Sequence, residues 1–229
     1  MAKNIVEAIQ EETPVIKTVS GTDKHSDNQV MIIGKIVNVF PTDKTLIVTV
    51  RVPKREPKGH VSFAFPKIYF FKADDTGIET FKEGDSIQVT GHLVNPVKRR
   101  ANGTRYFSQA IIGDKAVKNA SLFSTMLGTE DIGFANTQPA SLVYLRGRVE
   151  QIMQVGNRSI LIRLNAKQNG RNNHINVTTT NKDALLCTLG DIIAIYGTIE
   201  TRVAEKEDKK RYYQNIIAQK IVNESREIK

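Results

Sequence analysis

The sequence predicts an all-β protein made of two tandem five-stranded barrels, and three observations lead to this prediction. A stretch with the order strand, basic hairpin tip, strand occurs at residues 84–117 and again at residues 190–222. Each copy follows short segments rich in β-branched residues, which glycine, proline and polar residues separate. The connection between the third and fourth segments differs in length between the copies. A repeat of this size indicates that one β-rich unit is present twice.

The two copies of the hairpin align at one constant offset. Both tips are basic, and both lead into an arginine that two aromatic residues follow. We therefore expect two equivalent long hairpins between the fourth and fifth strands. The aligned pairs are Gly84 and Gly190, Asp85 and Asp191, Ile87 and Ile193, Gly91 and Gly197, Val97 and Val203, Arg105 and Arg211, Tyr106 and Tyr212, Phe107 and Tyr213, and Ile111 and Ile217.

The first domain is expected at residues 30–118. Its first strand, residues 30–40, carries a glycine near its centre, which suits a sharply coiled barrel strand. The second strand is expected at residues 45–52 and the third at residues 60–71. The hairpin over residues 84–117 supplies the last two strands, which makes five.

The second domain is expected at residues 142–229 and repeats this order. Its first strand, centred on Gly147, matches the first strand of the first domain position for position. Strands follow at residues 159–164 and 174–180. A short helix or loop is expected at residues 181–188, before the repeated hairpin.

Two segments fall outside these domains. Residues 1–29 are expected to form an N-terminal arm, in which Ile5, Val6 and Ile9 line one face of a short helix. Residues 119–141 mix glycine, threonine and asparagine with one proline and are expected to form a linker.

Five short strands with a variable connection between the third and the fourth fit a small Greek-key barrel, the OB-fold. The exposed face and hairpin loops of this fold bind oligonucleotides or oligosaccharides. The competing small barrel, the SH3-like fold, usually has shorter loops. We therefore predict two tandem OB-fold barrels with long hairpins between the fourth and fifth strands.

The net charge of +9 is unevenly distributed. The arm and the linker each carry −2, whereas the two predicted domains carry +7 and +6. A basic field confined to the folded units is typical of a protein that binds a polyanion. The alternative is a charge that only keeps the protein in solution.

Few features of the sequence indicate an enzyme, a metalloprotein or a membrane protein. The sequence lacks the motifs GxxxxGK[ST], GxSxG and HExxH, so neither catalysis nor a cofactor is expected. The four histidines are scattered and Cys187 stands alone in an apolar stretch, so we expect a buried thiol and no metal site. No apolar run approaches the ~18 residues that span a bilayer, and we expect no secretory signal in residues 1–20, which carry three glutamates and no continuous apolar stretch. A cytoplasmic location is expected.

The predicted third strand of the first domain has an unusual composition. Side chains alternate between the two faces of a strand, and the odd-numbered residues from 63 to 71 are aromatic except for one lysine. Such a face fits a platform on which bases stack, although it could also fill the barrel. Pro66 implies an edge or a bulge, after which the two faces could exchange. The residues of this face are Phe63, Phe65, Lys67, Tyr69 and Phe71.

Basic side chains gather in the loops and hairpins, where the phosphates of a bound strand would run. A charged hairpin tip is often only solvated and protects a sheet edge. Both tips lead into an arginine-aromatic step, however, which favours nucleic-acid binding. The further candidates are Lys54, Arg55, Lys98, Arg99, Arg100, Arg105, Tyr106, Arg146, Arg148, Arg171, Lys209, Lys210, Arg211 and Tyr212.

The two domains are expected to differ in their contributions. The third strand of the second domain, residues 174–180, contains no aromatic residue. We expect the first barrel to stack bases and the second to contribute phosphate contacts together with Tyr212 and Tyr213. The asparagine and threonine side chains of the second barrel could bond to bases or to a symmetry-related copy.

Over about 190 of its 229 residues, the chain resembles the bacterial and phage single-stranded DNA-binding proteins. The shared pattern is an apolar strand with a central glycine, an aromatic strand, a strand of the form KG…V.G.L, and a basic loop that closes on an Arg-Tyr step. In the first domain, residues 31–36, 60–71, 82–93, 98–103 and 105–106 carry it.

The resemblance implies an OB-fold that stacks bases on strand-borne aromatics, here Phe63, Phe65, Tyr69 and Phe71. Members with two OB-folds per chain assemble as dimers, so a homodimer that brings four OB-folds together is implied. The chain departs from the family in having no tryptophan and in ending with residues 224–229, which are mixed in charge rather than an acidic recruitment tail. These departures suit a phage, plasmid or divergent bacterial protein.

The sequence therefore predicts a non-catalytic protein that binds and protects single-stranded DNA in replication, recombination or repair. Two alternatives stay open. One is an adaptor whose barrels dock onto replication or phage-assembly proteins. The other is an RNA binder, because stacking platforms accept either sugar.

Overall fold

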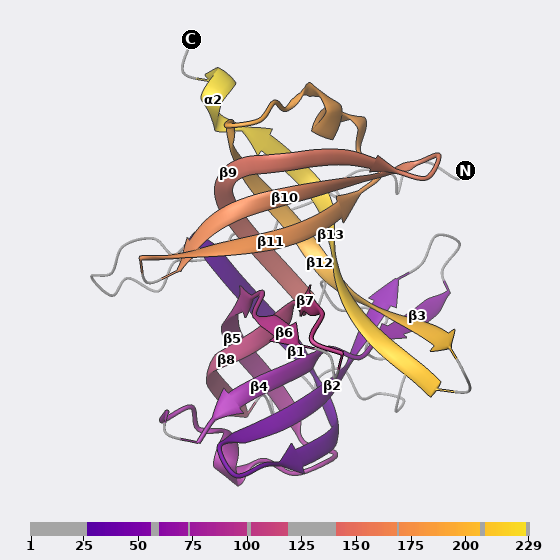
Figure 1. Ribbon diagram of the computed structural model, residues 1–229. Coiled ribbons are helices and arrows are strands. Elements are labelled where there is room, and N and C mark those ends of the chain that lie inside the picture. The colour runs from indigo at the N-terminus through magenta and orange to yellow at the C-terminus, as the bar shows by residue number, and fades with distance from the viewer. Residues whose placement is uncertain are drawn as a thin grey trace, which may run out of the picture.

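The computed structural model describes residues 27–55, 60–72, 74–99, 102–118, 141–168, 170–206 and 209–227. The regular structure in these ranges is almost entirely β-strand, arranged as two barrels stacked end to end (Figure 1). The predicted fold class is confirmed. Strands β1 to β8 form what we call barrel 1, and strands β9 to β13 form barrel 2.

Barrel 1 closes in the order β1, β2, β4, β8, β5 and back to β1. All these neighbours are antiparallel except β4 and β8, which are parallel. Short strand β3 continues β4 along β2, and the hairpin β6–β7 extends β5 and β8. This is the topology of an OB-fold. The strands are β1 (Asn28–Pro41), β2 (Thr45–Arg55), β3 (Val61–Ala64), β4 (Lys67–Phe71), β5 (Ser86–Val94), β6 (Val97–Arg99), β7 (Arg105–Phe107) and β8 (Ala110–Lys118), with a 3₁₀ turn at Ile78–Thr80.

Barrel 2 repeats this closure in the order β9, β10, β11, β13, β12 and back to β9. Strands β11 and β13 make the parallel contact. The predicted short helix before the hairpin is a 3₁₀ turn, Lys182–Leu186. The other elements are β9 (Ser141–Val155), β10 (Ser159–Gln168), β11 (Arg171–Thr179), β12 (Ile192–Lys206), β13 (Lys209–Asn223) and the short helix α2 (Glu224–Glu227).

The first strand of each barrel is sharply coiled. A Cβ on Gly34 would lie 2.5 Å from the carbonyl oxygen of Arg51 in β2, and Gly147 is equally crowded in barrel 2. Each strand also bulges at the same point, where Val37 in β1 and Glu150 in β9 are the extra residues. The central glycines therefore mark coiled barrel strands, as the sequence predicted.

The first strands of the two barrels also pair with each other, antiparallel. Val30 lies opposite Val143, and these two residues hold the same position in their barrels. A two-fold rotation that exchanges the barrels therefore leaves the pairing unchanged, which makes it an isologous contact within one chain. The pairing joins β13, β12, β9, β1, β5 and β8 into one continuous sheet.

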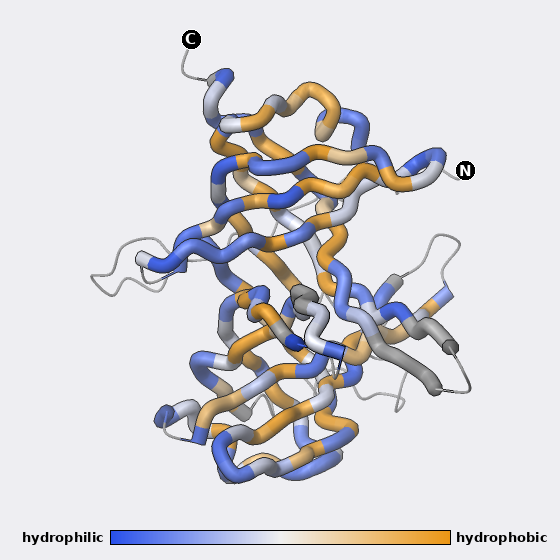
Figure 2. The backbone as a smooth tube through the Cα atoms, viewed as in Figure 1, coloured by the Kyte–Doolittle hydropathy of each residue, from blue (hydrophilic) through white to orange (hydrophobic). Residues whose placement is uncertain are grey.

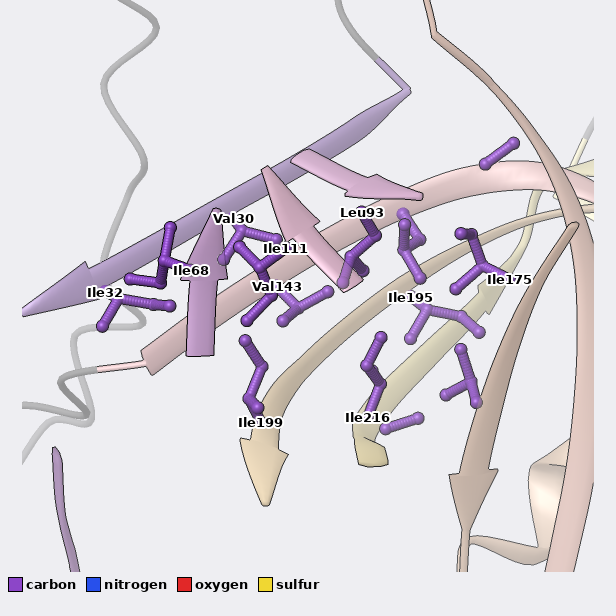
Figure 3. Packing of buried hydrophobic residues seen from close by; sticks show 14 of the residues in the cluster. Val30, Ile32, Ile68, Leu93, Ile111, Val143, Ile175, Ile195, Ile199 and Ile216 are labelled. Atoms are coloured by element: carbon purple, nitrogen blue, oxygen red, sulfur yellow. The ribbon is translucent and has the colours of Figure 1, made fainter. Parts of the chain in front are cut away.

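One hydrophobic core runs through both barrels. The buried apolar residues form a single cluster with members from each barrel. Figure 3 shows them extending from Ile32 and Ile68 in barrel 1, past Val30 and Val143 at the junction, to Ile175 in barrel 2. The barrels are thus joined by apolar packing as well as by backbone pairing.

The predicted alignment of the two hairpins is wrong beyond their tips. Leu93 in β5 lies opposite Ile111, and its equivalent Ile199 in β12 lies opposite Ile216. Ile111 therefore corresponds to Ile216 and not to Ile217. The reason is that the turn of the second hairpin is one residue shorter than that of the first, which a constant offset cannot accommodate.

The same shift separates the two Arg-Tyr steps. In the hairpin of barrel 1, Val97 lies opposite Phe107, and the equivalent Val203 in barrel 2 lies opposite Tyr212. Tyr212 therefore corresponds to Phe107 and not to Tyr106. The Arg-Tyr dipeptides recur in the sequence but not at equivalent positions of the two barrels.

Candidate nucleic-acid interface

The aromatic face of the third strand points outward from barrel 1. The buried residues are the even-numbered ones from 64 to 70, on both sides of Pro66, so the two faces do not exchange. The outward side chains are the predicted ones, Phe63, Phe65, Lys67, Tyr69 and Phe71, of which Phe65 is 38% and Phe71 is 43% exposed. Their aromatic surface is available to a ligand.

The third strand is nevertheless interrupted, where the sequence predicted one strand over residues 60–71. Pro66 has no N–H to donate to the ladder, so β3 ends before it and β4 begins after it. Its carbonyl still accepts a hydrogen bond from the N–H of Val50 in β2 (3.0 Å). This bond keeps the two pieces in line and explains why the alternation survives.

Arg51 in β2 adds a cation to this face. Its guanidinium carbon lies 5.1 Å from the centre of the Phe63 ring, within the range of a cation–π contact. The residue was not among the predicted candidates.

Phe40 adds an aromatic side chain that the sequence also did not reveal. It is exposed and lies opposite Ile47 in β2, which lies opposite Tyr69 in β4. In an unbroken strand Phe40 would share the inward face with Ile36, but the bulge at Val37 turns it outward. The platform therefore extends over three strands.

The hairpin β12–β13 of barrel 2 crosses to the third strand of barrel 1 (Figure 1). The N–H of Phe65 donates to Thr201 Oγ1 (2.9 Å), and Gln214 Nε2 donates to the carbonyl oxygen of Lys67 (3.0 Å). Strand β4 pairs with β8 only near Ile68. The hairpin thus satisfies backbone groups that the barrel's own closure leaves unpaired.

The hairpin of barrel 1 makes the corresponding contacts with β11 of barrel 2. Asn95 Nδ2 donates to the carbonyl oxygen of His174 (2.7 Å). The Gln109 amide donates to the carbonyl oxygen of Asn176 (3.2 Å) and accepts its N–H (3.0 Å). By the strand register, Asn95 and Gln109 occupy the positions of Thr201 and Gln214. The crossed hairpins therefore follow the same two-fold as the β1–β9 pairing.

Two predicted cations are engaged by carboxylates. Lys54 forms an ion pair with Glu200 of the crossing hairpin. Arg146 Nε donates to Glu224 Oε2 (2.8 Å), and its Nη1 lies 3.6 Å from Asp27 Oδ1. The hydrogen bond with Glu224 is the main cause that raises the pKa of Arg146. Both cations keep roughly two-fifths of their side chains exposed, so phosphate contacts by them stay a prediction.

Three other predicted cations are exposed, but the structure does not bring all of them to the aromatic face. Arg99 ends β6 and Arg171 begins β11. Arg148 donates from Nη1 to the carbonyl oxygen of Gly190 (3.3 Å), at the end of barrel 2 far from barrel 1. A nucleic-acid strand bound on the aromatic face would have to continue beyond it to reach Arg148.

For the remaining candidates, only the backbone position or nothing at all is described. Arg100 lies outside the described residues. For the other residues of this group, the structure describes the backbone but not the side chain. In β2 this concerns Arg55, in β6 Lys98, in β7 Arg105 and Tyr106, and in β13 Lys209, Lys210, Arg211 and Tyr212. Their roles stay predictions.

Barrel 2 has its own aromatic pair on the outer face of the joined sheet. The rings of Tyr144 and Tyr196 lie 5.2 Å apart and are tilted by 53°. Lys220 Nζ lies 6.0 Å from the centre of the Tyr196 ring. Burial, and then the neighbouring Tyr196, raise the pKa of Tyr144. No local pattern in the sequence groups Tyr144, Tyr196 and Lys220, because strand pairing alone brings them together.

Other kinds of site are not evident in the described ranges. Within them, no three His, Cys, Asp or Glu side chains stand close enough to hold a metal ion. No helix in these ranges is long and apolar enough to cross a membrane. Cys187 is buried, as predicted, and this burial raises the pKa of its thiol.

The fold is similar to solved structures of single-stranded DNA-binding proteins. The wild-type single-stranded DNA binding protein from Thermus aquaticus matches 87% of this chain and 93% of its own at 13% identity and a TM-score of 0.58. A deletion mutant of that protein matches 86% and 93% at 12% identity and a TM-score of 0.58. A Plasmodium falciparum SSB in complex with ssDNA matches 42% of this chain and 95% of its own at 14% identity and a TM-score of 0.32. No family model matches the sequence, and no curated protein does.

Proposed function

We propose that this chain binds single-stranded DNA without sequence preference and covers strands exposed in replication, recombination or repair. The observation that carries the proposal is the outward aromatic face of β3 and β4, flanked by basic residues. The fold shared with the Thermus aquaticus single-stranded DNA binding protein supports it. The protein would act by binding, not by catalysis, in the cytoplasm of a bacterium or of a phage-infected host.

Stacking on the platform would supply affinity without reading sequence. Every base presents a π-face, so an aromatic side chain accepts all four bases alike. Phe65 and Phe71 are the most exposed predicted rings, and Tyr69 and Phe40 would extend the platform toward β1. Arg51, held against Phe63, would contribute a cation to the same surface.

Basic side chains would guide the phosphates along this face. The hairpin β12–β13 continues for five residue pairs beyond Thr201 and ends in the pair formed by Lys206 and Lys209. We infer that the hairpin brings the basic tract Lys209–Arg211 of barrel 2 toward the proposed binding face of barrel 1. We propose that the binding face of barrel 1 is completed by residues of barrel 2.

We also propose that two copies associate through the outer face of the joined sheet. Met31 lies opposite Leu142 at the junction, and both side chains point outward and are only partly exposed. Tyr144 and Tyr196 extend this apolar surface. Two chains joined here would bring four OB-folds together. Light scattering should give the mass of a dimer, and Leu142→Glu should give a monomer.

A titration of oligo-dT and of duplex DNA at several salt concentrations tests the DNA proposal. Affinity for oligo-dT should be higher, and it should fall as salt rises because neutralised phosphates release counterions. Equal affinity for both forms, or an affinity independent of salt, would contradict the proposal. A competition between oligo-dT and oligo-U then decides between DNA and RNA, and no binding to either would favour the adaptor alternative.

A further inference from the structure

Three leucine side chains are exposed to solvent at one end of barrel 2. Leu185, Leu186 and Leu189 are 56%, 61% and 69% exposed, in the connection between β11 and β12. Figure 2 shows this connection coloured as apolar at the top of the barrel. Exposed apolar residues that cluster in this way mark interaction sites more often than scattered ones do. We call these three residues the leucine patch.

Barrel 1 shows that the fold does not require these leucines. Counting back from the glycines that end the two connections, Gly84 and Gly190, places polar residues at the same three positions of barrel 1. All three are exposed there too. The pairs are Glu79 with Leu185, Thr80 with Leu186, and Glu83 with Leu189.

The same hydrogen bonds hold the two connections, so their backbones have similar conformations at the compared positions. Asp191 Oδ2 accepts the N–H of Thr188 (2.9 Å), as Asp85 Oδ2 accepts that of Lys82 (3.0 Å). The N–H of Gly190 donates to β9 (2.9 Å), as that of Gly84 donates to β1 (2.8 Å). The leucines therefore add an apolar surface to a turn that forms without them.

The described chain begins beside this end of barrel 2. The carbonyl oxygen of Asp27 accepts the N–H of Arg146 (2.7 Å), and Arg146 in turn bonds to Glu224 in α2. The next residue of α2, Ser225, accepts the N–H of Ile192 (2.8 Å), at the end of the connection that carries the patch. Helix α2 thus contacts both Arg146, which holds the start of the described chain, and Ile192, which ends the connection that carries the leucine patch.

The direction and length of the preceding segment also fit. Strand β1 runs antiparallel to β9, so its upstream end points toward Val149, which lies about 10 Å beyond Arg146 and bonds to Gly190. From Arg148 onward, this edge of β9 pairs with β10 and offers no further pairing positions. The 18 residues from Ile9 to Asp27 can span up to about 60 Å.

We propose that the N-terminal arm of the same chain docks on the leucine patch through Ile5, Val6 and Ile9. These residues are spaced to form one apolar face of a short helix. Charge favours the same placement. The arm carries Glu7, Glu11 and Glu12. Three exposed cations lie at this end of barrel 2: Lys182 is next to Asp183 in the same connection, Arg148 donates to the carbonyl oxygen of Gly190, and Arg226 follows Ser225 in α2.

Site-specific photo-crosslinking in the full-length protein tests this proposal. A photoreactive phenylalanine analogue replaces Leu189, and the matched control carries it at Glu83, the equivalent position of barrel 1. Mass spectrometry should find crosslinks from position 189 to residues 1–16 of the same chain and none from position 83. The double substitution Ile5→Asp and Ile9→Asp should reduce the yield from position 189 to that of the control.

Amide hydrogen exchange supplies a second readout, in proteins that carry no photoreactive residue. Amides of residues 184–190 should exchange faster in the Ile5→Asp, Ile9→Asp variant, while residues 78–84 should be unaffected. Three results would overturn the proposal: no crosslink to the arm, a crosslink yield unchanged by the double substitution, or crosslinks only between two chains. None of these results depends on DNA binding, so they leave the proposed function untouched.

Discussion

Gly113 and Phe70 pack closely against each other in the core of barrel 1. A Cβ on Gly113 would lie 2.1 Å from Phe70 Cε1, which is far inside contact distance. In barrel 2 the corresponding residues are Ala218 and Thr179, and Thr179 Oγ1 donates to the carbonyl oxygen of Ala218 (3.1 Å). Each barrel therefore has its own matched pair at this point of the core.

Gly113→Ala should lower the free energy of unfolding by about 1–3 kcal/mol, because the added methyl overpacks the core of barrel 1. The loss should be smaller in a Phe70→Leu background, where the ring edge is gone. Urea unfolding of the four proteins measures both effects. An equal loss in the two backgrounds would show that the clash with the ring is not the cause.

The aromatic platform gives a prediction about binding. The double substitution Tyr69→Ala and Phe71→Ala should weaken oligo-dT binding by about 1–3 kcal/mol for each lost stack. Since Tyr69 and Phe71 point outward, thermal unfolding should change little. Fluorescence anisotropy measures the affinity. Met153→Ala, at the position of Phe40 in barrel 2, is the control and should bind normally.

Among the structural elements, the crossing hairpins determine how the proposed binding face is assembled. Hairpin β12–β13 is anchored to the third strand of barrel 1 by Thr201 and Gln214. Lys54 and Glu200 add an ion pair between the same two elements. The hairpin is therefore part of the platform's surroundings rather than a separate appendage of barrel 2.

Removing the charge of this tip should reduce the salt dependence of binding. In the variant Lys209→Gln, Lys210→Gln, Arg211→Gln, each lost phosphate contact should lower the slope of log K against log salt by about 0.7. The variant Lys182→Gln, Lys220→Gln, Arg226→Gln loses the same charge elsewhere on barrel 2. An equal change of slope in the two variants would mean that only net charge matters.

Several of these elements could be predicted from the sequence because the signals are local. The repeat predicted two barrels, and the period-two alternation predicted the outward face from Phe63 to Phe71. The bulges at Val37 and Glu150 could not be predicted, because a bulge depends on how β1 coils over β2. The bulge at Val37 is what turns Phe40 outward. The crossing contacts join residues more than 60 positions apart, which no local pattern encodes.

For the molecule as a whole, the shared core implies that the barrels fold together. The buried cluster crosses the β1–β9 junction without a break, so the predicted domains 30–118 and 142–229 would each expose part of it if separated. This exposure should make each half unstable or self-associating. We therefore expect the joined sheet to be required for stability and not only to link two independent units.

Calorimetry of the intact chain should accordingly show one unfolding transition whose calorimetric and van't Hoff enthalpies agree. Val143→Asp, at the junction, should lower the temperature of that single transition. Ser159→Asp, at the far end of barrel 2 in the β9–β10 hairpin, is the control and should have little effect. Two separate transitions in the unmodified protein would contradict this prediction.

The antiparallel pairing of β1 and β9 has a consequence for how this protein can change over time. In a dimer of identical chains, every substitution appears on both sides of the two-fold, so neither half can specialise without the other. Here both halves of the pairing belong to one polypeptide, and dilution cannot separate them. Each half can therefore acquire substitutions of its own while the shared junction holds them in register. Such independence permits a row of aromatic side chains on one barrel and three leucines on the other.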